Sequence, residues 1–186
     1  TEANFEAIAL KIFQFQYEKN DFYRQYCDSI NIQLQGIKRL EQIPFLPIQF
    51  FKSKEISFTD FEPGTVFESS VTTGSVSSRH FVKDTGLYEE SFLRSFNKFY
   101  GDIKSYCIIG LLPSYLERKQ SSLVWMVNEL IKKSQYPQSG FYLNEFEKLK
   151  EVILQNEKAG QQTILMGVTY ALLDFFEANP IELKYT

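Results

Sequence analysis

The 186-residue sequence predicts an α/β fold, in which helices cover the faces of a largely parallel sheet. Short apolar runs alternate with amphipathic segments over the second half of the chain, which is typical of parallel strands joined by helical crossovers. Hydrophobic residues make up 44% of the chain, enough for a substantial core, and 18 Phe and 11 Tyr suit layered packing. We predict a helical N-terminal segment over 1–58 and an α/β lobe over 59–186, joined without a low-complexity linker as one continuous unit.

The N-terminal segment carries helical patterns. Four large apolar residues recur at helical spacing with Glu, Lys and Gln between them, which predicts an amphipathic helix: Phe5, Ile8, Ile12 and Phe15. A second short helix is predicted over 21–30. Two prolines, Pro44 and Pro47, then interrupt the chain, so 43–51 predicts a turn that leads into one short helix.

The lobe begins with a predicted hairpin, whose strands cover 65–69 and 79–82. Three further apolar runs predict the buried strands of the sheet: 106–112, 141–143 and 163–166. The pattern predicts helices over 87–100, before the first of these runs, and around 123–131, after 144 and over 168–178, between and after them. Asn144 followed by Glu147 is a plausible cap for the third of these helices.

Composition excludes several classes of function. The formal net charge of −3 and the pI of about 5.3 give no general attraction to nucleic acid. One His and two Cys outside any CxxC pair are too few for a classical zinc site, so no metal ligands are predicted. Cys27 and Cys107 are expected to be small buried hydrophobes. The sequence shows neither a signal peptide nor an apolar stretch of bilayer length, so we expect a cytoplasmic protein.

One segment carries a chemical motif. Residues 69–75 read Ser-Ser-Val-Thr-Thr-Gly-Ser between the two strands of the predicted hairpin. Hydroxyls together with glycine amides can converge on phosphate oxygens, and Arg79, His80 and Lys83 add positive charge just beyond the run. An exposed hairpin turn of the same composition is the alternative. The segment is neither a Walker loop nor a GxGxxG loop.

The run 69–75 resembles the Ser/Thr-Gly-Thr-Thr-Gly phosphate loop of adenylate-forming enzymes. Ile-Pro-Phe-Leu-Pro-Ile-Gln-Phe-Phe-Lys at 43–52 precedes it, and Gly-Leu-Leu-Pro-Ser-Tyr at 110–115 follows it. In this order the three segments resemble the LuxE group of acyl-protein synthetases, and the resemblance covers roughly 43–178. It implies the fold of the front part of the N-terminal domain of adenylate-forming enzymes.

The resemblance also implies a reaction. A fatty or other carboxylic acid would be joined to AMP from ATP and Mg²⁺, and the acyl group would then pass to a thiol or protein acceptor. The implied ATP phosphate-binding residues are Ser69, Ser70, Thr72, Thr73, Gly74, Ser75 and Arg79. Tyr115, Gly167 and Tyr170 would border the acyl pocket, although Tyr115 could equally cap a strand, and an ordinary core turn explains the other two.

The sequence departs from the family pattern at several points. Val71 stands where the family has glycine, and a β-branched residue resists positive φ. The family commonly has a lysine near the position of Ser77, where only Arg79 is close in this chain. The later Tyr-Gly-x-Thr-Glu motif is missing from the 186 residues. We therefore expect a truncated chain that is inactive alone, with self-association through surface exposed by the truncation. A non-catalytic α/β module that binds a partner chain is the alternative function, and an unrelated phosphate-binding enzyme with a Ser/Thr loop is a third.

Overall fold

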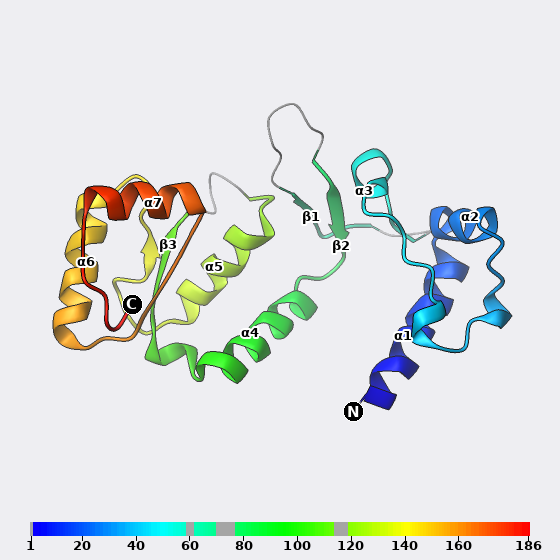
Figure 1. Ribbon diagram of the computed structural model, residues 1–186, viewed down its shortest axis with the longest axis horizontal. Coiled ribbons are helices and arrows are strands. Elements are labelled where there is room, and N and C mark those ends of the chain that lie inside the picture. The colour runs from blue at the N-terminus through cyan, green and yellow to red at the C-terminus, as the bar shows by residue number, and fades with distance from the viewer. Residues whose placement is uncertain (1, 59–61, 70–76, 114–118) are drawn as a thin grey trace. The chain divides into compact units, whose positions relative to one another are not determined.

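A computed structural model describes residues 2–58, 62–69, 77–113 and 119–186 (Figure 1). Contacts divide the chain into two compact units, Thr1–Asp84 and Thr85–Thr186. The division falls later than the 58/59 boundary expected from the sequence, because the hairpin groups with the N-terminal helices. One such contact is the stacking of Phe51 on His80, with ring centroids 5.2 Å apart.

The first unit opens with helices α1, Glu2–Lys19, and α2, Asp21–Ser29, which confirms both predicted helices. Asn20 separates them, and its side-chain Oδ1 accepts a hydrogen bond of 3.0 Å from the Tyr23 backbone N–H. This bond satisfies one of the free donors at the start of α2. The small core of the unit forms around Phe13, Tyr23 and Cys27.

The apolar stripe predicted on α1 does not face this core. Its four residues remain between 45% and 64% exposed: Phe5, Ile8, Ile12 and Phe15. Phe13 is instead the buried residue of the helix, and its ring lies 6.3 Å from Tyr17 and 6.2 Å from Tyr23. The helix therefore packs on α2 through a face that the spacing of the larger apolar residues did not indicate.

Short elements complete the first unit. Two 3₁₀ turns, Leu34–Gly36 and Leu40–Gln42, lead to α3, Phe50–Ser53. Strands β1, Thr65–Glu68, and β2, Arg79–Val82, pair antiparallel as predicted, with Glu68 opposite Arg79 at the loop end. The described residues of this two-stranded sheet share no pairing with the larger sheet of the second unit.

The second unit is a three-stranded parallel sheet in the order β4-β3-β5, which confirms an α/β fold. The central strand β3, Cys107–Leu111, pairs with β4, Gly140–Phe141, and with β5, Thr163–Gly167. The absence of a side chain at Gly110 allows β3 and β4 to pack closely, because a Cβ there would lie 2.7 Å from the Phe141 ring. All five residues of β3 are buried, as the continuous apolar run predicted.

Helices cover both faces of this sheet. They are α4, Gly86–Tyr100, α5, Ser122–Lys133, α6, Phe146–Ala159, and α7, Thr169–Ala178. A 3₁₀ turn, Ile103–Ser105, lies between α4 and β3. Ile109 packs with α6 and α7 through Ile153 and Phe175. Ile108 points the other way, toward α4 and α5, where Phe96 and Leu130 lie. Figure 1 shows these two helix pairs on opposite sides of β3.

One local prediction in this unit is wrong. Asn144 does not cap α6, because the capping position is Glu145, which makes no side-chain cap hydrogen bond. The Glu145 N–H instead donates to the Tyr142 carbonyl in a turn, at 2.9 Å. The helix consequently starts one residue later than the Asn-Glu pattern indicated.

Candidate functional site

Paired serines hold together the two ends of the Ser/Thr-rich segment. The Ser69 N–H donates to the Ser78 carbonyl at 3.0 Å, and the Ser78 N–H donates to Ser69 Oγ at 3.0 Å. These bonds extend the hairpin by one pair beyond Glu68 and Arg79. The chain therefore leaves β1 and returns to β2 from adjacent positions, as expected for a loop fixed at its base.

Most of the predicted phosphate-binding residues lie outside the described residues. Five of them fall in the segment 70–76: Ser70, Thr72, Thr73, Gly74 and Ser75. Ser69 at the base of the loop and Arg79 at the start of β2 are described. Their role in binding phosphate stays a prediction.

Two nitrogen-bearing side chains follow the loop on β2. Arg79 is exposed, and its guanidinium carbon lies 5.5 Å from the centroid of the Phe81 ring. His80 Nε2 lies 3.3 Å from Ser78 Oγ, with which it shares a hydrogen bond. A guanidinium beside a hydroxyl-rich loop suits an anion. The described contacts of His80 are with a hydroxyl and the Phe51 ring, an arrangement unlike that of a general base oriented by a carboxylate.

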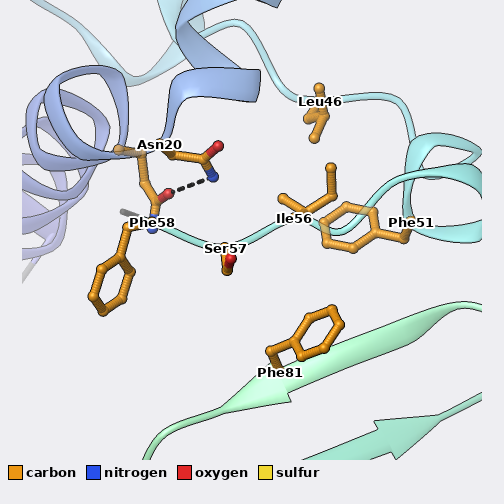
Figure 2. Close-up of a pocket in the computed structure, with 8 residues that line it drawn as sticks. Asn20, Leu46, Phe51, Ile56, Ser57, Phe58 and Phe81 are labelled. Carbon is orange, nitrogen blue, oxygen red and sulfur yellow. Dashed lines mark hydrogen bonds between the residues drawn. The ribbon is translucent and has the colours of Figure 1, made fainter. Parts of the chain in front are cut away.

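A cavity of about 300 Å³ lies beside β2 in the same unit. Figure 2 shows Phe51, Ile56, Ser57 and Phe81 around it. Its polar side is formed by Asn20 and Gln16, where Asn20 Nδ2 donates to Gln16 Oε1 at 3.1 Å. No pattern in the sequence indicated that these polar residues line a cavity. Asn20, between two helical patterns, offered a signal for a cap but none for a cavity.

A second cavity of about 360 Å³ runs along α1. It is a groove between the exposed apolar stripe of α1 and the segment that contains Pro44 and Phe45. Gln16 and Leu46 line both this groove and the first cavity, so the two adjoin. Neither was indicated by a motif.

The residues predicted to border an acyl pocket belong to other parts of the chain. Tyr115 lies outside the described residues. Gly167 ends β5 in a packed position, since a Cβ there would lie 2.9 Å from Leu172 and 3.0 Å from Leu111. Tyr170 is exposed on α7. Gly167 and Tyr170 line neither of the two cavities described above, so their role in an acyl pocket stays a prediction.

Both thiols are buried, as predicted. Burial raises the pKa of the Cys107 thiol above its ordinary value, although the Ser139 hydroxyl, 3.8 Å from the sulfur, acts in the opposite direction. Burial also raises the pKa of Cys27. A reactive thiol requires the reverse, a lowered pKa and access to solvent. The two cysteines therefore serve as core residues.

Two features, a cluster of metal-binding side chains and a membrane-spanning helix, are absent from the described part of the chain. No three His, Cys, Asp or Glu side chains gather there in a way that could hold a metal ion. Within the same ranges, no helix is both long and apolar enough to cross a bilayer.

Comparison with known proteins supports the resemblance drawn from the motifs. The long-chain-fatty-acid–luciferin-component ligase of Aliivibrio fischeri is 24% identical over 192 aligned residues, which cover 96% of this chain and 49% of the relative. The predicted resemblance is confirmed. The chain spans about half the length of this relative. No family model matches the chain. No solved structure matches it either, so the likeness to the adenylate-forming fold stays a prediction.

Proposed function

We propose that this chain is the ATP-phosphate-binding part of an enzyme that activates a carboxylic acid and transfers the acyl group to a thiol or protein acceptor. The similarity along 96% of the chain to a long-chain-fatty-acid ligase carries the proposal. The paired serines at the base of the Ser/Thr-rich segment support it, because they fix both ends of the loop that would hold the phosphates. That relative is a ligase, which does not favour the alternative of a non-catalytic module.

The proposed reaction has two steps. An oxygen of the carboxylate attacks the α-phosphorus of ATP and forms a new P–O bond. The bond from that phosphorus to the bridging oxygen breaks, and pyrophosphate leaves with the electron pair. The acceptor then attacks the acyl carbon of the acyl-adenylate and AMP leaves. Most of the rate acceleration comes from holding two anions in position and neutralising the charge on the phosphates.

The chain's own residues would supply that charge neutralisation. The hydroxyls of Thr72 and Thr73 and the amide of Gly74 would donate to the β- and γ-phosphates, while Arg79 would pair with a phosphate or carboxylate oxygen. Mg²⁺ would reach the site on the triphosphate. Val71 would have to be accommodated in an extended conformation.

Titration calorimetry with MgATP and with AMP tests this function. The proposed contacts involve the β- and γ-phosphates, which AMP lacks, and hydrogen bonds to charged groups contribute about 1.5–3 kcal/mol each. We expect MgATP to bind the 186-residue chain at least about tenfold more tightly than AMP. Equal affinities for the two nucleotides, or no binding of MgATP, would contradict the proposal.

A further inference from the structure

The two cavities of the first unit adjoin. The first lies next to β2 and the second follows α1, and Gln16 and Leu46 line both. The stretch of α1 from Phe5 to Gln16 forms one wall of the groove, a length of about 16 Å for an α-helix. A ligand that occupied both cavities would therefore be elongated.

The two cavities differ in chemistry. The groove is lined by hydrocarbon from the exposed face of α1 and from the segment opposite, including Ile8, Ile12 and Phe45. The first cavity adds polar groups at one side, from Asn20, Gln16 and Ser57. Among the described residues, no Asp, Glu, Lys, Arg or His lines either cavity. An apolar groove that adjoins a cavity with polar groups matches an amphiphile with a single hydrocarbon chain.

A cation lies beside one residue of the first cavity. Phe81 lines the first cavity, and the Arg79 guanidinium carbon lies 5.5 Å from the centroid of its ring. A carboxylate that reached past Phe81 would meet this guanidinium, which pairs well with carboxylate geometry. Arg79 also borders the Ser/Thr-rich segment, so the carboxylate would lie close to the loop proposed to hold ATP.

We infer that the first unit holds the hydrocarbon chain of a long-chain carboxylic acid, with the tail in the α1 groove and the carboxylate directed toward Arg79. The inference rests on the proposed function for the acid's identity as substrate. A docked protein helix suits this site less well, because a helix about 10 Å wide could cover the groove without filling the adjoining cavity of about 300 Å³.

Equilibrium dialysis of the 186-residue chain with labelled dodecanoate and hexanoate tests the inference. Each buried methylene strengthens binding about fourfold, so dodecanoate should bind at least about a hundredfold more tightly than hexanoate. Ile12→Gln should weaken dodecanoate binding about tenfold without unfolding the chain, because Ile12 is already 55% exposed. Leu87→Gln is the matched control, since Leu87 is 77% exposed and lies on α4 in the other unit.

Three results would overturn the inference. These are a failure of dodecanoate to bind, equal loss of binding in Ile12→Gln and Leu87→Gln, and a change of oligomeric state in Ile12→Gln with unchanged dodecanoate binding. The last would identify the groove as a contact between copies of the chain. MgATP affinity is measured in the same samples. Dodecanoate binding without nucleotide binding would refute the proposed function alone, whereas MgATP binding with no dependence on acid chain length would refute only the acyl site.

Discussion

Replacing Phe175 with alanine is expected to lower the free energy of unfolding of the second unit by about 3–5 kcal/mol. Phe175 is fully buried, and its ring packs edge-on against Phe146, with centroids 5.5 Å apart. It also contacts Phe176 at 5.1 Å and belongs to the cluster that covers one face of β3. Alanine would leave a cavity between α7 and the sheet, which the surrounding side chains fill only in part.

Urea unfolding followed by the fluorescence of Trp125 measures this loss, because Trp125 lies on α5 in the same unit. Leu173→Ala provides the control on the same helix. Leu173 is exposed, so its replacement should change the free energy of unfolding by no more than about 0.5 kcal/mol. Similar losses for both variants would show that α7 does not pack through Phe175.

The double variant Thr72→Ala and Thr73→Ala is expected to weaken MgATP binding by at least about tenfold. Each threonine hydroxyl is proposed to donate to a charged phosphate oxygen, and alanine cannot replace that donor. The same change should leave AMP binding nearly unaltered, since AMP lacks the phosphates concerned. Titration calorimetry of the variant against the unaltered chain gives both affinities.

A second pair of hydroxyls serves as the control for this variant. Ser53 is exposed at the end of α3, and Thr85 makes no side-chain cap hydrogen bond to α4. Replacing both with alanine removes the same number of hydroxyls away from the Ser/Thr-rich segment. Unchanged MgATP affinity in the threonine variant, or an equal loss in this control, would count against a phosphate-binding role for that segment.

The fold was largely predictable from sequence because its central elements obey simple patterns. The apolar run at 106–112 contains the fully buried strand β3, and the hydroxyl-rich segment lies between two paired strands. The helix over 87–100 starts within one residue of its predicted position. In each case, burial or a change of composition marks the element locally in the chain.

Other features depend on tertiary packing, which periodicity does not reveal. The spacing of Ile8 and Ile12 identified a helix correctly but not the face that it buries, because α2 packs on Phe13 instead. The cavity beside β2 combines Gln16 and Asn20 with Phe81, more than sixty positions away in the sequence. No local pattern predicts that residues so far apart share one cavity.

The central claim is that the loop between β1 and β2 holds the triphosphate of ATP. Amide resonances of an isotopically labelled chain, followed by NMR during titration with MgATP and then with adenosine, test this claim most directly. We expect MgATP to shift the resonances of 69–79, Gly74 among them, and adenosine to leave them in place. Shifts confined to other parts of the chain, or equal shifts with both compounds, would contradict it.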